Sequence, residues 1–394
     1  MQTGIPFEFI LFALTLLGIA LFHRHTLPIA VGGLVAIVMY KWFGPGFNEG
    51  AGLAGLVAHF GHEWVLLSNL LCLLLGFALL ARCFEDSRAP LLLPKYLPDN
   101  WTGALSLLVL VFVISSFLDN IAAALIGGAM AHALFRGKVH IGYLAALVAA
   151  SNAGGAGSVV GDTTTTMMWI SGIGPLEVLH AYVGSLVALA VFGVPAALVQ
   201  QRYSPIMRDA QPVTMDWARL VIVAFVLGCA IATNVAVNLQ PGSLGDRFPF
   251  IGVAVVVSLL ASTLFRPLEW RLLPGALLSS IFLLSLVACA SLMPVNRLPE
   301  ASSLTAFGLG FVSAVFDNIP LTALALRQGG YDWGMLAYAV GFGGSMIWFG
   351  SSAGVALSTQ FPEARSTRLW LKHGWFVIVA YVAGFGVLEL LFRR

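Results

Sequence analysis

The stretches SSFLDNI at residues 115–121 and SAVFDNI at residues 313–319 share the pattern Ser-x-x-x-Asp-Asn-Ile. A glycine-rich stretch follows each of them, NAGGAGSVVGDTTTT at 152–166 and GFGGSMIWFGSS at 341–352. In both glycine-rich stretches a Gly-Gly pair is followed by five residues, a third glycine, an Asp or Ser, and a Thr or Ser. Because the two blocks recur in the same order, they indicate a duplicated unit.

The composition of the chain is that of a polytopic membrane protein. Of its 394 residues, 59% are hydrophobic and only 10% are charged, whereas an ordinary soluble domain has about 25% charged residues. The mean hydropathy is +0.92. The net charge of +2 gives no reason to expect a nucleic-acid partner. The four cysteines show neither metal-binding nor redox spacing, and we expect them to fill space between helices.

Apolar segments that are long enough to cross a bilayer recur along the chain. A spanning helix needs about 20 apolar residues. Uninterrupted candidates lie at 5–22, 26–43, 62–81, 178–200, 218–239, 249–265, 272–293 and 373–392. Two further candidates, 141–170 and 334–359, are long enough but are interrupted by Gly-Gly and hydroxyl residues. The sequence therefore predicts an all-α fold with about ten transmembrane helices, two of them broken.

Two other apolar stretches, 103–135 and 302–327, carry Asp-Asn near their middle. In a straight spanning helix that carboxylate would lie in hydrocarbon, at a cost of roughly 2.5–3.5 kcal/mol. A re-entrant helical hairpin avoids the cost, because its Asp-Asn tip is buried in protein rather than in lipid. We therefore expect two re-entrant hairpins.

The distribution of Lys and Arg predicts the topology. If the N-terminus lies outside and each hairpin returns to its starting side, 14 basic residues fall inside and 6 outside, as the positive-inside rule requires. The six outside are Lys41, Arg247, Arg297, Arg327, Arg393 and Arg394. Each half then holds an odd number of spans, so the second half is inverted relative to the first. The expected location is a bacterial-type inner (plasma) membrane, with the lipid bilayer as the main partner.

The inverted halves set the predicted domain boundaries. The first repeat covers 1–200, with scaffold helices within 5–81, and the second covers 218–394, with scaffold helices within 218–293. The polar segment 201–217 between them is the expected cytoplasmic linker. In each repeat a hairpin, a broken helix and a final helix follow the scaffold helices. Inverted repeats with broken helices and a site near mid-membrane are typical of secondary transporters.

Three aspartates at membrane depth are the main site candidates. Asp119 and Asp317 occupy the same place in the two repeats, and Asp162 follows the third glycine of the first repeat. An ionisable residue inside a membrane segment is a functional-site hypothesis by default. Alternatively, each Asp only caps a helix by accepting backbone N–H bonds, although Ser or Asn would do so without burying a charge. We expect the three carboxylates to bind protons or a metal cation, sodium in the first instance.

Neighbouring polar residues are further candidates. Asn120 and Asn318 each follow a hairpin aspartate and could serve either the ion or the turn. The hydroxyl candidates are Thr163, Thr164, Ser351 and Ser352, with Ser351 standing where the first repeat has Asp162. The candidate helix-break glycines are Gly154, Gly155, Gly161, Gly343, Gly344 and Gly350. Backbone unwound at such glycines frees carbonyls that can bind a hard cation, although small residues also allow tight helix packing.

A set of buried carboxylates at the repeat interface suggests cation/proton exchange. Burial and like-charge proximity of Asp119, Asp317 and Asp162 both disfavour the ionised form, so these groups could exchange protons near physiological pH. Sodium or lithium would compete with the protons for the same oxygens. With alternating access, that competition is sufficient for antiport without a cofactor. The sequence shows no Walker motif and no soluble domain that would hold a nucleotide.

The motifs resemble those of the NhaD-type sodium/proton antiporters, in the ion transporter superfamily that includes arsenite permeases and divalent-anion symporters. The resemblance is carried by NAGGA from Asn152, GDTTTTMMW from Gly161, DNIP from Asp317 and GGS…GSSAGV from Gly343. It implies a homodimer with scaffold helices at the interface and a transport domain that carries both hairpins in an elevator-like movement. The chain departs from the family after Asn120, where Ile-Ala-Ala-Ala-Leu replaces a run of threonines.

Two other classes of function remain open at this point. A cation-coupled permease for a small anion, a carboxylate or an oxyanion, would present helix N-termini to its substrate. Neither block contains Arg or Lys, however, and the anion symporters of the superfamily carry Ser-Asn-Thr at the hairpin tips. An intramembrane aspartyl protease would use two of the aspartates, but its Gly-x-Gly-Asp pattern needs Gly where Val160 stands. A non-enzymatic sodium (or lithium)/proton antiporter is the leading expectation.

Overall fold

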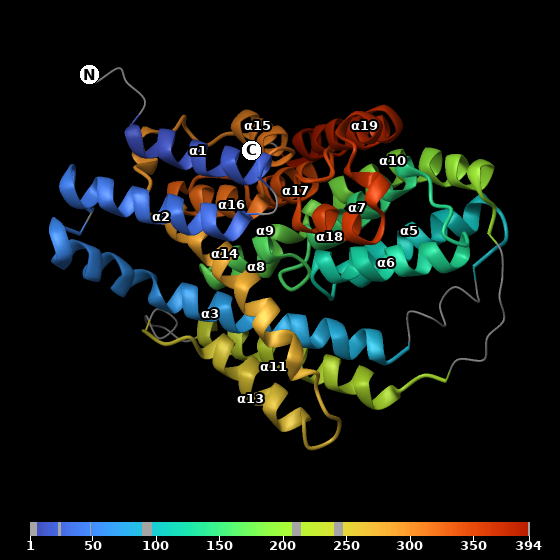
Figure 1. Ribbon diagram of the computed structural model, residues 1–394, viewed down its shortest axis with the longest axis horizontal. Coiled ribbons are helices and arrows are strands. Elements are labelled where there is room, and N and C mark those ends of the chain that lie inside the picture. The colour runs from blue at the N-terminus through green and yellow to red at the C-terminus, as the bar shows by residue number, and fades with distance from the viewer. Residues whose placement is uncertain are drawn as a thin grey trace.

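The computed structural model describes residues 6–22, 25–47, 49–88, 97–206, 214–239 and 247–392. Within these ranges the regular structure is helical, apart from one isolated bridge between Phe47 and Gly50 (Figure 1). The predicted linker 201–217 lies only partly inside the described residues, because 207–213 fall outside them. An all-helical polytopic membrane protein is therefore confirmed.

The helices of the first half follow the order expected from the sequence. They are α1 (Phe7–Leu21), α2 (Thr26–Phe43), α3 (Gly52–Asp86), α5 (Trp101–Ser115), α6 (Asn120–Leu134), α7 (Ile141–Gly155), α8 (Thr163–Ile170), α9 (Pro175–Leu179) and α10 (Ala181–Tyr203). The second half contains α11 (Trp217–Leu239), α13 (Phe250–Ser262), α14 (Leu273–Ser291), α15 (Ser303–Ser313), α16 (Asn318–Gln328), α17 (Trp333–Gly343), α18 (Ser352–Gln360) and α19 (Thr367–Phe392).

Six helices among the described residues are long and apolar enough to cross a membrane. Other apolar helices, including α1, α13 and the arms of both hairpins, are shorter than that length, so the predicted count of ten spans stays a prediction. The largest error in predicted bounds concerns α3, which has 35 residues against the predicted segment 62–81. Its first turns carry His59, His62 and Glu63, which lower the local hydropathy without breaking the helix.

The predicted interruptions of the apolar segments are all present. The segment 103–135 divides into α5 and α6, with the break before Asn120, and 302–327 divides into α15 and α16, with the break before Asn318. The segment 141–170 divides into α7 and α8, and 334–359 divides into α17 and α18. Each break occurs at the Asp-Asn or glycine-rich motif that predicted it.

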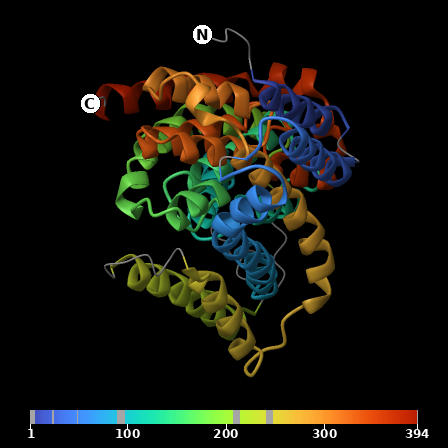
Figure 2. The same cartoon turned by 90° about the vertical axis from the view of Figure 1, so that its left-hand side faces the viewer.

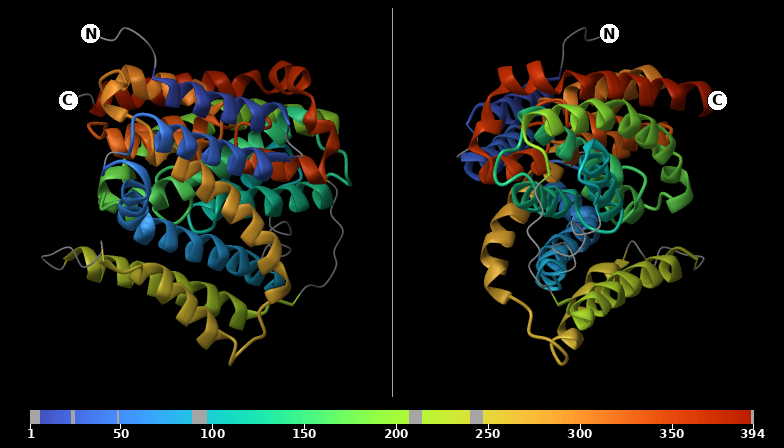
Figure 3. Two further views of the ribbon diagram at one scale, coloured as in Figure 1. Left: turned by 60° about the vertical axis from the view of Figure 1, so that its left-hand side comes forward. Right: turned by 90° about the vertical axis from the view of Figure 1, so that its right-hand side faces the viewer.

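The helices form two sets by their packing. In the scaffold set, α1 packs on α2, α2 on α14, α14 on α3, α3 on α13 and α13 on α11. In the core set, α5 packs on α7, α7 on α10, α10 on α19, α19 on α17 and α17 on α15. Figures 2 and 3 show α11 and α13, in yellow, at the opposite end of the molecule from α19, in red. The sets meet where α14 contacts α16 and where α3 contacts α6 and α8.

Contacts in the two halves correspond. The pair α5 and α7 matches the pair α15 and α17, and the pair α6 and α18 matches α16 and α8. Two further helices of the first half pack directly on the helices that hold the same place in the second half. These pairs are α3 with α14 and α10 with α19. Each broken helix therefore joins its own hairpin through one arm and the hairpin of the other half through the second arm.

The two broken helices lie at the centre of the protein. Every residue of α7 from Gly142 to Gly155 is buried, and so is every residue of α17 from Gly334 to Gly343. The scaffold helices instead expose large apolar side chains, such as Leu14 at 58% and Val221 at 65%. Since a bilayer is the medium that solvates such faces, the exposed surface is the lipid-facing one.

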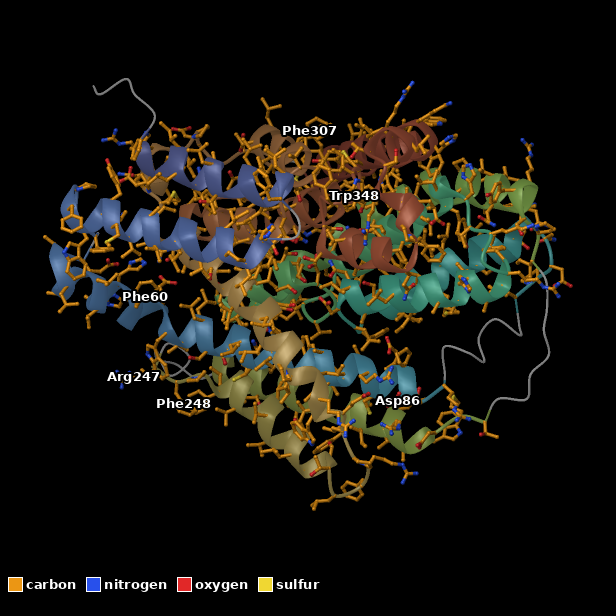
Figure 4. The ribbon with its side chains drawn as sticks, viewed as in Figure 1. Phe60, Asp86, Arg247, Phe248, Phe307 and Trp348 are labelled. Carbon is orange, nitrogen blue, oxygen red and sulfur yellow. The ribbon has the colours of Figure 1, made fainter. Side chains whose placement is uncertain are left out.

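Charged residues tie one end of the scaffold set together. Arg82 Nε donates to Glu269 at 2.7 Å, and Arg219 pairs with Asp86 at 3.4 Å. Figure 4 shows Asp86 at the end of α3. Asp216, which precedes α11, accepts from Arg266 at 3.2 Å, and this hydrogen bond lowers the pKa of the Asp216 carboxyl. These pairs join α3 to the ends of α11, α13 and α14.

We predict that Gly310→Ala destabilises the fold and that Gly308→Ala does not, although both glycines lie in α15. A Cβ at Gly310 would overlap the Tyr381 hydroxyl and lie 2.7 Å from the Ala339 carbonyl oxygen, whereas a Cβ at Gly308 meets nothing within 4 Å. Overpacking of this kind costs about 1–3 kcal/mol. Unfolding temperatures measured in detergent check the difference. Equal temperatures for the two variants would contradict the packing described here.

Candidate functional site

The tip of the first hairpin is closed by Asp119. This carboxylate caps α6, because its Oδ2 accepts the backbone N–H of Ile121 at 3.2 Å. Its Oδ1 accepts from the Thr163 hydroxyl, in the first turn of α8, at 3.4 Å. The hairpin tip and the restart of the broken helix therefore meet through one carboxylate.

The tip of the second hairpin repeats this arrangement. Asp317 caps α16 by accepting the backbone N–H of Ile319 at 3.1 Å. Its other oxygen accepts from the Ser352 hydroxyl, in the first turn of α18, at 2.7 Å. Ser352 holds the place in the second half that Thr163 holds in the first. The equivalence predicted from the sequence pattern is thus present in the side-chain contacts.

The restarts of the broken helices are capped by different residues. Asp162 Oδ1 accepts the backbone N–H of Thr164 at 3.2 Å and begins α8. Ser351 Oγ accepts the backbone N–H of Gly354 at 3.3 Å and begins α18. Four helix N-termini, those of α6, α8, α16 and α18, are therefore capped by side chains from the two repeated blocks. Capping by a carboxylate also places negative charge where the helix dipole favours it.

A buried amide network connects the capping residues. Asn120 donates to Asn152 Oδ1 at 3.1 Å and to Asp162 Oδ1 at 3.4 Å. Asn152 in turn donates to the hydroxyls of Ser345 at 2.9 Å and Ser351 at 3.1 Å. The network crosses from the first half to the second, so Asn152 joins the two broken helices.

Glycines allow the hairpins to approach the broken helices. A Cβ on Gly154 would overlap the backbone of Phe112, and one on Gly343 would overlap the backbone of Gly310. A Cβ on Gly161 would overlap the carbonyl of Ser115, in α5. These close approaches are the physical reason for glycine at the three positions.

The other predicted break glycines act in the same way. A Cβ on Gly350 would overlap the carbonyl of Ala314. Gly155 and Gly344 face the carbonyls of Gly161 and Gly350, at 2.8 Å from the position of a Cβ in both cases. Each Gly-Gly pair therefore packs against the third glycine of its own motif, where the chain turns back to restart the helix.

The halves differ at the centre of the network. The residue equivalent to Asn152 is Gly341, and the residue equivalent to Asp162 is Ser351. A Cβ on Gly341 would lie 3.1 Å from Asp162 Oδ2. Asn152 therefore lies next to Ser351, and Gly341 lies next to Asp162. The missing side chain of Gly341 leaves room beside the only oxygen of Asp162 that the network does not use.

Several buried polar atoms of this site have no hydrogen-bond partner. They are Asp162 Oδ2, Asn318 Nδ2 and the Thr164 hydroxyl, although Asp162, Asn318 and Thr164 are only 1%, 3% and 0% exposed. Such orphaned groups are rare in native proteins, because each costs about 1–3 kcal/mol. Asp162 also interacts electrostatically with both Asp119 and Asp317. A proton or cation bound at Asp162 Oδ2 would give this oxygen a partner and lower the cost of burying the carboxylate.

A cavity of about 310 Å³ reaches one side of the site. Asp317 and Ser352 line it, together with Ile121 of the first hairpin and apolar residues of α1 and α14. The cavity joins the scaffold set to the second hairpin tip, so Asp317 is the carboxylate that this opening reaches.

Comparison with known proteins agrees with the motifs. No family model matches the chain. Sodium/proton antiporter 1 of Arabidopsis thaliana is 29% identical over 310 residues, which cover 69% of this chain and 53% of the relative. The Na(+)/H(+) antiporter NhaD of Alkalimonas amylolytica is 26% identical over 363 residues, which cover 78% of this chain and 72% of the relative.

The chain is related to the NhaD-type sodium/proton antiporters. Sodium/proton antiporter 2 of Arabidopsis thaliana, 27% identical over 353 residues, covers 78% of the chain and is itself covered to 79%. The chain spans about half the length of the first of these relatives and roughly three quarters of the other two. The resemblance inferred from the repeated motifs is confirmed.

The structure joins most of the sequence candidates through side-chain hydrogen bonds. Asp119 with Thr163, Asp317 with Ser352, and Asp162 with Asn120 are in direct contact. The described residues contain no group of three or more His, Cys, Asp and Glu side chains placed to hold one metal ion. Asp119 and Asp317 cap helices α6 and α16, and joint binding of a cation by them and Asp162 stays a prediction.

Sequence reasoning missed several members of the site. Asn152 was quoted only as part of a motif, yet it forms three hydrogen bonds, two of which join the halves. Ser345 accepts one of them. Ser115 and Ser313, the first residues of the repeated pattern, donate to the carbonyls of Ser151 at 2.5 Å and Val340 at 2.7 Å. Their identical places in the pattern were the available signal.

We predict that Asn152→Ala destabilises the protein by about 1–3 kcal/mol, because it leaves buried partners in both halves unsatisfied. Ser185→Ala is the matched control, since the Ser185 hydroxyl is buried without a partner. Thermal or denaturant unfolding in detergent measures both. A variant at Asn152 as stable as the Ser185 variant would show that the network does not hold the halves together.

Proposed function

We propose that the chain is a secondary transporter that exchanges sodium or lithium for protons. The observation that carries the proposal is the Asp162 carboxylate, which is buried, has one unpartnered oxygen, and accepts from Asn120 in the amide network that joins the two halves. The names of its relatives, which are sodium/proton antiporters, support the same activity.

The exchange follows from competition for oxygens. A buried carboxylate is unstable without a countercharge, so it takes up either a proton or a cation. Sodium is a hard cation, and the site offers it carboxylate, amide and hydroxyl oxygens from Asp162, Asn152, Ser345 and Ser351. Binding of sodium to these oxygens releases the proton, and the reverse step takes it back.

Alternating access would couple the exchange to transport. We propose that the two halves are inverted repeats, because equivalent helices make equivalent contacts. The core set, with both hairpins, would move as a unit against the scaffold set in an elevator-like step. By the charge rule the N-terminus lies outside, and we expect a homodimer formed through scaffold helices in a bacterial-type plasma membrane.

Proteoliposomes loaded with a pH-sensitive dye test this proposal. Added sodium or lithium should move protons across the membrane, and Asp119→Asn, Asp162→Asn and Asp317→Asn should each reduce the rate at least about a hundredfold, because removal of an obligatory charge costs several kcal/mol. Asparagine caps helices as well as aspartate does, so these variants keep the caps and remove only the charge.

Glu300→Gln is the control, since Glu300 is exposed and outside the site. Its rate should equal that of the parent. If neither cation moves protons between about pH 6 and pH 9, the range in which buried carboxylates can titrate, the antiporter proposal is wrong. Sodium-dependent uptake of a labelled carboxylate or oxyanion would then identify an anion permease, and cleavage of a spanning peptide would identify a protease.

Competition also fixes the sign of the pH dependence. Protons occupy the carboxylates as the pH falls, so the apparent KM for sodium should rise, approaching about tenfold per pH unit if one proton competes with one ion. Initial rates measured over a sodium series at several pH values give this slope. A KM independent of pH would mean that sodium and protons do not share a site.

A further inference from the structure

An ion pair joins the scaffold set to the second hairpin. Arg327, in the last turn of α16, donates through Nη2 to Oε1 of Glu63, in α3. The two side chains are only 26% and 14% exposed. Other ion pairs in the described part of the chain connect helices within one set, as Arg82 with Glu269 and His180 with Asp332 do. The Glu63–Arg327 pair therefore crosses the boundary along which the two sets would move.

The pair lies at the end of α16 opposite the transport carboxylate. Asp317 caps the start of this helix, and Arg327 is ten residues later. At 1.5 Å per residue, about 15 Å of helix separates them. The cavity of about 310 Å³ reaches Asp317, while Glu63 and Arg327 line a different cavity of about 220 Å³.

Apolar side chains close in sequence to the site carboxylates line the second cavity. Met167 of α8, Val287 of α14, and Ile319 and Ala323 of α16 belong to one buried cluster. Met167, Val287 and Ala323 also line the cavity beside Glu63 and Arg327. We call these side chains the plug; they line the cavity beside the ion pair, whereas the cavity that Asp317 lines is a different one.

The scaffold wall of the second cavity is held in place. Ser291 of α14 lines it, and its hydroxyl lies 2.9 Å from Nε2 of the buried His59 of α3. The other ring nitrogen of His59 lies 3.1 Å from Glu49. Because α3 and α14 are linked at this level, Glu63 belongs to the scaffold set, and Arg327 would move with the core set in the proposed elevator-like step.

We propose that Glu63 and Arg327 form a latch that keeps the plug closed on the side of the site opposite the Asp317 cavity. The inference rests on the proposed function. A half-buried guanidinium–carboxylate pair stabilises the state in which it forms, and its loss shifts the population toward the state in which α16 has moved away from α3. The pair has to break once in every transport cycle.

Thiol labelling at the plug tests the latch directly. Ala323→Cys, at a residue 6% exposed, is placed in a protein whose four native cysteines are replaced, and a membrane-impermeant maleimide is added to proteoliposomes without sodium. The parent should label slowly. Arg327→Gln and Glu63→Gln should each raise the labelling rate about tenfold. The exchanged pair Glu63→Arg with Arg327→Glu should return the rate toward that of the parent.

Arg297→Gln is the matched control, because Arg297 is an exposed arginine in the segment that precedes the second hairpin. It should leave the labelling rate unchanged. Equal rates in the parent and in both single variants overturn the latch. A rate that stays high in the exchanged pair overturns it as well, since loss of packing rather than of the ion pair would then explain the singles.

A second measurement covers variants that fold poorly. Glu63→Cys with Arg327→Cys, joined by a short bifunctional thiol reagent, should stop ion exchange, while either single cysteine treated alike should not. Exchange that continues after joining overturns the latch and leaves the antiporter proposal intact. If the labelling follows the predicted pattern while sodium moves no protons, the latch stands and the antiporter proposal is overturned.

Discussion

The structure depends on the need to satisfy helix N-termini inside an apolar protein. Each broken helix leaves backbone N–H groups without intrahelical partners, and lipid or buried apolar surroundings offer no water to bind them. Asp119, Asp162, Asp317 and Ser351 meet this need from within the repeated motifs. The same carboxylates that permit the breaks thereby place negative charge at the centre, so the fold and the proposed chemistry have one physical origin.

The two halves differ in their residues at the centre of the site, and this difference leaves a single carboxylate there. If both halves carried the same residues, two equivalent carboxylates would face each other in a buried site, at a high electrostatic cost. Instead Asp162 faces Gly341, and Asn152 bonds Ser351. The first half supplies the charge of Asp162 and the amide of Asn152, while the second supplies the space at Gly341 and the hydroxyls of Ser345 and Ser351. The Glu63–Arg327 pair is a further asymmetry, since it lies on the side of the second hairpin alone.

Much of this arrangement followed from the sequence, because the responsible residues are local. An Asp-Asn pair in the middle of an apolar stretch disfavours a straight spanning helix, so the breaks before Asn120 and Asn318 were predictable. The contacts between halves were not, because spacing along the chain does not say which side chains meet across a packing interface. Asn152 was missed for that reason, and the pairing of Glu63 with Arg327 was not predicted either.

The most direct test of whether sodium and protons share one site is the release of protons when sodium binds. Purified protein in weakly buffered detergent solution is mixed with sodium, and the pH change is recorded alongside calorimetric binding. We predict that each bound ion displaces about one proton per competing carboxylate at a pH where the free site is fully protonated, and progressively fewer as the pH rises. Sodium that binds without any release of protons would contradict it, because ion and proton would then occupy separate sites.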